Sequence, residues 1–221
     1  MATLPTIARG QVEAADFLVA HQGPDGAWRY EFPFTYTDAD GDRSQTLAAG
    51  WVAAQAQGNA ISLLARMYAA TGERRYLTAA NRGLQPLGRP VGAAGIAVAL
   101  DGHTLLAGYP TPTPTLTLED YEGALIGVAD LAPYSQQAQR LLSTLLPSFY
   151  WSLPLYTSPS GMPYYDLFQH FAGGARGEID PTSAQTCAAA LRTLLAGYPS
   201  PAAAGALATW TAALNALGLG A

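Results

Sequence analysis

"GWVAAQAQGNAISLLARMYAAT", residues 50–71, has the pattern of an amphipathic helix. Its apolar residues Ile61, Leu64 and Tyr68 recur every three or four positions, which places them on one face of a helix. Gly72 follows directly, and a glycine after such a pattern commonly ends a helix. The stretch therefore predicts a helix that buries one face against other helices.

Similar patterns predict that the rest of the chain is mostly helical. Further helices are expected at about 5–21, 73–84, 117–131, 135–147, 182–196 and 201–217. Gly/Pro-rich stretches separate them, some with hairpin character. The hexapeptide LLAGYP occurs twice, at 105–110 and 194–199, each time where an apolar run stops, and this repetition suggests stacked helical hairpins. We expect an all-α fold in which residues 1–221 form a single α/α toroid of antiparallel helical hairpins with short β-hairpin loops.

Composition limits the partners of the protein. Charged residues make up only 12% of the 221 residues, the formal net charge is −5, and there is no run of Lys or Arg. Nucleic acid is excluded as a partner because its phosphates require clustered cations. A surface so poor in charge favours self-association into a homo-oligomer.

Cysteine usage and the two ends of the chain give further expectations. Cys187 lies on a predicted helix, where we expect a small buried side chain. "MATLPTIARG" at the N-terminus lacks the pattern of a signal peptide, so we expect a cytoplasmic protein. No charged residue follows Thr193, but Gly, Pro and Asn interrupt the apolar character, which favours a packed pair of terminal helices over a transmembrane segment.

Several stretches together resemble a known family. These are "HQGPDGAW" at 21–28, the stretch 50–80, "YPTPTPTLTL" at 109–118 with "LIGVADL" at 125–131, "LPLY" at 153–156, and "YYDLFQHF" at 164–171. In this order they are similar to the C-terminal catalytic domain of the D-glucuronyl C5-epimerases, over roughly residues 15–197. The resemblance implies an α/α toroid, a saccharide substrate, no cofactor, and an active site of tyrosines and an arginine.

The resemblance extends to two tyrosines and departs at three other positions. Tyr109 and Tyr165 match tyrosines that the family uses for acid–base work. After the Tyr-Asp-Leu of the second motif the family has Arg-His-Phe, where this chain has Phe168 and Gln169 before its His-Phe. The family's asparagine after the Tyr-Pro-Thr segment is Glu119 here, and its third tyrosine has no counterpart after the Ala-Arg pair.

The missing arginine matters for the chemistry. Epimerisation at C5 of a uronate removes a proton beside a carboxylate, and the charge that develops requires a fixed cation. The remaining candidate is Arg176 or an arginine of another loop. A tyrosine also has an ordinary pKa near 10, which neighbouring groups must lower before it can act as a base near neutral pH. The first hypothesis is therefore an acid–base isomerase with Tyr109 and Tyr165 as the pair, without the family's specificity for a uronate.

A second hypothesis comes from "FLVAHQGPDGAW" at 17–28, which is similar to a repeat of class II terpene cyclases. In that pattern the glutamine satisfies backbone groups at a helix end and the tryptophan packs on the next hairpin. A cyclase requires an aromatic pocket and one carboxylic acid kept protonated by its surroundings. The candidates for the pocket are Trp28, Trp51, Tyr109, Tyr121, Trp151, Tyr165 and Phe168, and those for the acid are Glu119, Asp101, Asp166 and the aspartates of 38–42. The Asp-x-Asp-Asp motif of that class is absent.

The remaining polar residues leave alternatives open. Trp51 and Gln57 are expected to shape the pocket, and Tyr164 and His170 are either site residues or packing residues beside Tyr165. The three histidines lack the spacing of a zinc site. Asp38, Asp40 and Asp42 could bind calcium or form a solvated turn. The third functional hypothesis is a non-catalytic remnant that binds carbohydrate.

The three hypotheses differ in what surrounds Tyr165. An isomerase predicts an arginine or lysine within reach of both tyrosines. A cyclase predicts a deep, dry pocket with one carboxyl at its end and no cation. A binding remnant predicts neither a pocket nor an effect of Tyr165→Phe on turnover.

Overall fold

The computed structural model describes residues 8–38 and 41–219 and is mainly helical. The helices are α1 (Arg9–His21), α2 (Ala54–Thr71), α3 (Arg74–Gly88), α4 (Leu118–Leu131), the 3₁₀ turn η1 (Ala132–Tyr134), α5 (Gln136–Tyr156), α6 (Phe168–Ala172), α7 (Pro181–Gly197) and α8 (Pro201–Ala216). Two antiparallel hairpins pair β1 (Phe34–Thr37) with β2 (Ser44–Leu47) and β3 (Ala97–Leu100) with β4 (His103–Leu106). The predicted helical class is confirmed.

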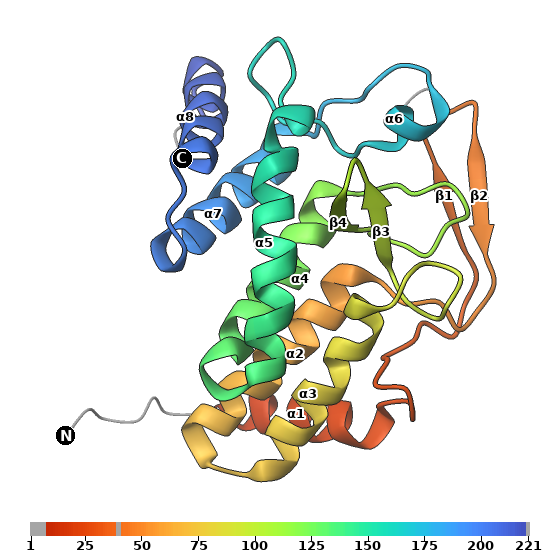
Figure 1. Cartoon of the computed structure of the whole chain (residues 1–221), viewed down its shortest axis with the longest axis vertical. Helices are drawn as coiled ribbons and strands as arrows, with labels where there is room; N and C mark the ends of the chain where they lie inside the picture. The colour runs from red at the N-terminus through yellow and green to blue at the C-terminus, as the bar shows by residue number, and fades with distance from the viewer. Residues whose placement is uncertain (1–7, 39–40, 220–221) are drawn as a thin grey trace.

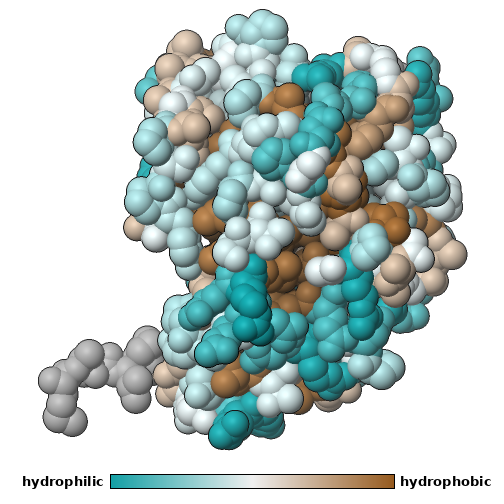
Figure 2. Space-filling model, in the orientation of Figure 1, coloured by the Kyte–Doolittle hydropathy of each residue, from teal (hydrophilic) through white to brown (hydrophobic). Residues whose placement is uncertain are grey.

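Helices α2, α3, α4 and α5 form the centre of the molecule (Figure 1). Helix α1 crosses one end of this group, α7 and α8 lie at its other end, and the β1–β2 hairpin stands on the opposite side from α8. Figure 2 shows apolar side chains gathered in the middle of the same face, between α5 and the β3–β4 hairpin.

Helix α5 continues beyond its predicted end. A proline inside a helical pattern commonly ends the helix, because it lacks an N–H group and its ring crowds the preceding turn. Here α5 contains both Pro147 and Pro154. Phe149 and Leu153, on the far side of Pro147, are fully buried. Burial of this apolar face therefore outweighs the cost of the prolines, and the predicted end at 147 is wrong.

The interpretation of LLAGYP as a repeat is also wrong. Its first copy begins in strand β4 and its second copy ends helix α7. The first copy follows the tip of the β3–β4 hairpin, where Asp101 and Gly102 both have positive φ, at 48° and 79°. An Asp-Gly pair with two positive φ angles is typical of a two-residue hairpin turn. The turn ahead of the hexapeptide thus decides its structure.

The pattern at 17–28 fixes α1 and the following loop, as the cyclase-like repeat implies. The side-chain amide of Gln22 donates to the carbonyls of Gly26 (3.0 Å) and Ala79 (2.9 Å). The Trp28 indole donates to the carbonyl of Leu18 at 2.8 Å, in the last turn of α1. Gln57 is fully buried and its Oε1 accepts from the backbone N–H of Trp28 at 2.8 Å. Trp28 and Gln57 therefore hold the backbone in the core, whereas the sequence predicted that they contact substrate.

The two terminal helices pack as the expected pair. Trp210 of α8 is fully buried, and its indole N–H donates to the Thr157 hydroxyl at 3.0 Å. Cys187 of α7 is fully buried, as predicted. Within the described residues, the helices are too short or too polar for any of them to cross a membrane.

Glycines let α2 and α4 approach each other backbone to backbone. A Cβ on Gly58 of α2 would lie 2.2 Å from the carbonyl oxygen of Gly123, and a Cβ on Gly127 of α4 would lie 2.1 Å from the carbonyl oxygen of Gly58. Real Cβ atoms do not come so close to backbone, which cannot move aside as the end of a side chain can. Any larger residue at Gly58 or Gly127 therefore forces the two helices apart.

We predict that Gly127→Ala lowers the free energy of unfolding by about 2 kcal/mol or more, because it overpacks this contact. Alanine would otherwise favour a helix over glycine by up to about 1 kcal/mol. Gly205→Ala on α8 is the matched control, since nothing lies within 4 Å of its added Cβ. Urea denaturation measures both variants. Equal stability of the two would contradict the close approach of α2 and α4.

Candidate functional site

A cavity of about 500 Å³ opens beside the first turns of α2. Four aromatic residues line it, Tyr30, Phe34, Trp51 and Tyr109. Its polar lining consists of Gln55, Asn59 and Asp120, and small or aliphatic residues of α1 and α2 complete it. The size and the mixture of aromatic and hydrogen-bonding groups suit one or two sugar units or a small apolar molecule.

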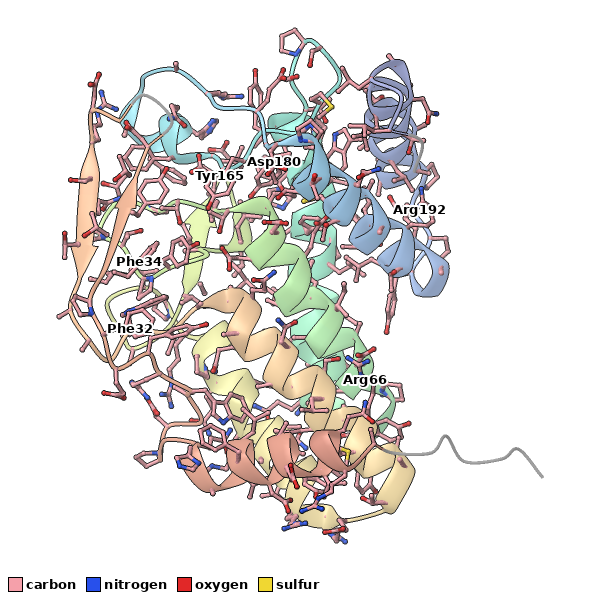
Figure 3. The ribbon with its side chains drawn as sticks, turned by 180° about the vertical axis from the view of Figure 1, so that it is seen from behind. Phe32, Phe34, Arg66, Tyr165, Asp180 and Arg192 are labelled. Atoms are coloured by element: carbon pink, nitrogen blue, oxygen red, sulfur yellow. The ribbon has the colours of Figure 1, made fainter. Side chains whose placement is uncertain are left out.

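The aromatic wall is a packed cluster around Trp51. The Trp51 ring stacks with Tyr30 at a centroid distance of 4.4 Å and with Phe34 at 5.0 Å, and Phe34 lies 4.7 Å from the Tyr109 ring. The Trp51 indole donates to the carbonyl of Phe32 at 2.8 Å. Figure 3 shows Phe32 and Phe34 on the segment that runs beside the start of α2. Sequence reasoning missed Phe34 as a site residue. The signal for it is the placement of aromatic residues at every second position of "EFPFTY", residues 31–36.

The structure brings Tyr109 and Tyr165 together. The two phenols lie close enough for each to influence the pKa of the other, and Asp120 influences both. The backbone of Tyr165 is clamped, since its N–H donates to Gly177 at 2.9 Å and its carbonyl accepts from Leu118 at 3.0 Å. The Tyr165 side chain is 38% exposed, so solvent and ligands can reach it.

The environment keeps both phenols protonated near neutral pH. Burial raises the pKa of Tyr109, and the charge of Asp120 and the neighbouring Tyr165 raise it further. Burial also raises the pKa of Tyr165, but the nearby Tyr109 hydroxyl opposes that rise. Tyr165 is therefore the member of the pair whose phenolate is better stabilised.

Asp120 joins this pair to helix α2. Its carboxylate is buried and accepts a hydrogen bond from the Thr117 hydroxyl, and the Tyr109 hydroxyl and the backbone N–H of Gln55, in the first turn of α2, also act to lower its pKa. Burial raises the pKa of Asp120, and the three donors oppose the rise. Our sequence reasoning missed this residue. The Thr-x-x-Asp spacing of Thr117 and Asp120 at a helix start, which resembles a capping box, was the available signal.

None of the residues that line the cavity is an arginine or a lysine. Arg176 lies at Tyr164, where its guanidinium carbon is 5.3 Å from the ring centroid and its Nη1 donates to the carbonyl of Leu155 at 3.3 Å. Arg43 donates to the carbonyls of Ala172 and Gly173. Among the described residues, the arginine or lysine that we expect for an isomerase is therefore missing from the lining of this cavity.

The residues after Tyr165 form a separate buried group. Asp166 accepts from the Tyr36 hydroxyl at 2.6 Å and from the backbone N–H of Phe168 at 3.0 Å. Burial raises the pKa of Asp166, opposed by these donors. Phe168, at the position of the family's arginine, is buried with its ring 5.3 Å from that of Tyr36. It begins the short helix α6, and His170 on that helix is exposed.

Other predicted site residues lie apart from the cavity. Tyr121 is fully buried, with its hydroxyl donating to the carbonyl of Leu145 at 3.0 Å. Trp151 stacks on His103 at 4.0 Å, and Asp101 is exposed at the tip of the β3–β4 hairpin. The structure therefore does not gather these three residues into the aromatic pocket that the cyclase hypothesis predicted.

Helix α4 carries two more acids beside Asp120. Glu119 is half-buried, and its pKa is raised by burial and by the charges of Asp120 and Asp180. Glu122 is 1% exposed, and neither of its carboxyl oxygens has a hydrogen-bond partner. Burial raises the pKa of Glu122 well above its ordinary value, and the adjacent Cys187 thiol only partly opposes this. Glu122 is therefore a neutral acid in the core.

Asp38 and Asp42 of the aspartate-rich stretch lie between β1 and β2. Asp38 is buried, and its Oδ1 accepts from the backbone N–H groups of Asp42 (3.0 Å) and Arg43 (3.1 Å). Asp40 lies outside the described residues. Over residues 8–38 and 41–219, no three His, Cys, Asp or Glu side chains are grouped closely enough to hold a metal ion.

Comparison with known proteins connects this geometry to a family. The family model described as the C-terminus of D-glucuronyl C5-epimerase matches residues 22–196. A D-glucuronyl C5-epimerase of Caenorhabditis elegans is 31% identical over 175 residues, which cover 73% of this chain. The match covers 27% of the length of that relative.

We predict that Glu122 makes the protein less stable as pH rises. In the folded state its raised pKa keeps the proton, whereas the unfolded chain releases it above the ordinary value of 4.5. The unfolded state thus binds fewer protons, and the free energy of unfolding falls from about pH 4.5 upward. Urea denaturation at pH 5 and pH 8 should show a smaller loss for Glu122→Gln than for the wild type. The exposed Glu31→Gln is the control; an unchanged loss in Glu122→Gln would show that Glu122 is not buried as a neutral acid.

Proposed function

The chain belongs to the family of D-glucuronyl C5-epimerase C-terminal domains, and from this premise we propose that it is an acid–base isomerase of the epimerase type, acting on a saccharide. The observation that carries the proposal is that Tyr109, which lines the cavity beside α2, lies close enough to Tyr165 for the two phenols to influence each other's pKa. By the same resemblance we propose that the helices form an α/α toroid.

We assign Tyr165 as the base and Tyr109 as the acid. The Tyr109 hydroxyl opposes the rise in the pKa of Tyr165, so the Tyr165 phenolate is the more stable of the two. Because both phenols are protonated in the free protein, Tyr165 first releases its proton to solvent. With a sugar ring bound at the two phenols, the Tyr165 phenolate takes a proton from a ring carbon and the Tyr109 hydroxyl donates one to the opposite face. When the product leaves, transfer of a proton from the Tyr165 hydroxyl to the Tyr109 phenolate restores the state in which Tyr165 is the phenolate. Asp120 is a positioning residue that fixes the Tyr109 hydroxyl.

The absence of an arginine from the cavity lining limits the charge that a substrate can carry beside its reacting C–H bond. Removal of a proton beside an ionised carboxylate would place a second negative charge next to the first, and no cation of the lining would offset it. The buried Asp120 would repel that charge further. We therefore propose that the group that acidifies the reacting C–H bond is uncharged, as in an esterified or amidated uronate.

One observation favours a second candidate. The cavity has an aromatic wall, one buried carboxyl and no cation in its lining, which is the arrangement that a protonation-initiated cyclase requires. In that case Asp120 would donate a proton to an apolar polyene. A cyclase forms a ring without exchanging a proton at a sugar carbon, so the experiment below separates the two functions.

We predict that Tyr109→Phe and Tyr165→Phe each slow epimerisation by about 10²–10⁴-fold, because each removes a general acid or base. The measurement is incorporation of solvent deuterium at the ring carbon of uronate-containing polysaccharides and of their methyl esters. The methyl ester should exchange faster than the free acid. Tyr164→Phe is the control, because Tyr164 lies at Arg176, and it should retain the wild-type rate.

Retention of full exchange in Tyr165→Phe would exclude the tyrosine mechanism. Absence of exchange in the wild type, together with cyclisation of a polyene that depends on Asp120, would support the second candidate instead. Saccharide binding without turnover would identify a non-catalytic carbohydrate-binding protein.

A further inference from the structure

We propose that a second cavity, between α3 and the start of α5, binds an anionic sugar unit: a hydroxylated molecule that carries one carboxylate, sulfate or phosphate group. The volume of this cavity is about 330 Å³, and it shares no lining residue with the cavity beside Tyr109. The site is therefore separate from the one proposed for catalysis.

The cationic part of the lining comes from one face of α3. Arg74 and Arg82 are eight residues apart, which is close to two helical turns and places both on the same side of α3. Thr78 lies between them on that face, and Gln85 continues the face by one more turn. Gln137, in the first turn of α5, closes the other side of the cavity.

Hydrogen bonds hold the walls of this cavity in place. Arg82 Nη2 donates to the carbonyl of Gly23 at 2.7 Å, which leaves the remaining N–H groups of a fixed guanidinium for a ligand. Asn81, also in the lining, donates to the carbonyl of Leu77 and accepts from the hydroxyl of Ser135, the N-cap residue of α5. Asn81 thus ties α3 to α5 across the cavity, so the two walls are positioned before any ligand binds.

The charge of the cavity is opposite to that of the whole chain. The formal net charge is −5, yet no carboxylate lines this cavity. Arg74 makes no ion pair within the described residues, and the first turn of α5 contains no acidic residue. Figure 2 shows strongly hydrophilic surface over this part of the molecule, where α3 and the beginning of α5 lie. An anion would therefore meet two guanidinium groups and no competing acid of the lining.

The composition of the lining indicates the ligand class. Guanidinium groups bind the planar or tetrahedral oxygens of carboxylate, sulfate and phosphate through paired hydrogen bonds. Amide and hydroxyl side chains, here Thr78, Gln85 and Gln137, suit the hydroxyls of a sugar ring. The volume lies at the lower end of the range for small-molecule sites, which fits one sugar unit.

Calorimetric titration at constant ionic strength tests the proposal with four probes: glucuronate, glucose 6-sulfate, glucose 6-phosphate and neutral glucose. At least one charged sugar should bind to the wild type more tightly than glucose, and the tightest of the three identifies the anion. Arg74→Gln combined with Arg82→Gln should weaken that binding at least tenfold. Arg9→Gln combined with Arg192→Gln removes the same number of charges elsewhere and should leave it unchanged.

Two more variants keep the outcome interpretable. Arg74→Gln alone changes an exposed side chain and should weaken binding at least threefold even if the double variant fails to fold. Tyr109→Phe should leave this binding unchanged, which separates the site from the tyrosine cavity. The proposal is overturned if no charged sugar binds more tightly than glucose. Equal affinity in Arg74→Gln and wild type, or loss of binding in Tyr109→Phe alone, would overturn it too.

Discussion

The backbone contact between α2 and α4 is the constraint on which the rest of the structure depends. Gly58, Gly123 and Gly127 remove the side chains that would otherwise separate the two helices. Close approach of this kind stabilises a protein through many weak contacts of tightly packed atoms. It also fixes the start of α4 beside the start of α2, and both ends contribute to the cavity.

That arrangement determines the chemistry available at the site. Because the first turns meet, the backbone N–H of Gln55 in α2 acts to lower the pKa of Asp120 of α4. The partial positive charge of a helix N-terminus stabilises such a carboxylate. Asp120 and Tyr109 influence each other's pKa, and the carbonyl of Tyr165 accepts from the N–H of Leu118, the first residue of α4. Both tyrosines are thus positioned by the beginning of one helix.

The sequence predicted the helices well because their apolar residues recur with the helical period, which local spacing reveals. It failed where tertiary packing or a neighbouring turn decided the outcome. Burial of Phe149 carried α5 past Pro147, and the Asp101-Gly102 turn placed the first LLAGYP copy in a hairpin. The first case depends on residues distant in the sequence, and the second on a turn signal that competes with the helical pattern. The spacing of apolar residues alone predicts neither outcome.

Site residues could be predicted from the sequence only where a local motif marked them. Tyr109 and Tyr165 were found through their motifs, and the structure brings them together. Trp28 and Gln57 stood in equally conspicuous motifs but serve the core, since the partners that bury them come from separate helices. Asp120 was missed because its importance arises from the crossing of α2 and α4.

The most direct test of this account is ¹³C NMR of ring-labelled tyrosines in Gly123→Ala. A Cβ at this position would lie 2.8 Å from Cγ and 3.4 Å from Cα of Gln55, so the variant crowds Gln55 in the first turn of α2. If the contact positions the site, the ring signals of Tyr109 and Tyr165 shift while those of Tyr68 do not. Unchanged ring signals of both site tyrosines would contradict the dependence of the site on the α2–α4 contact.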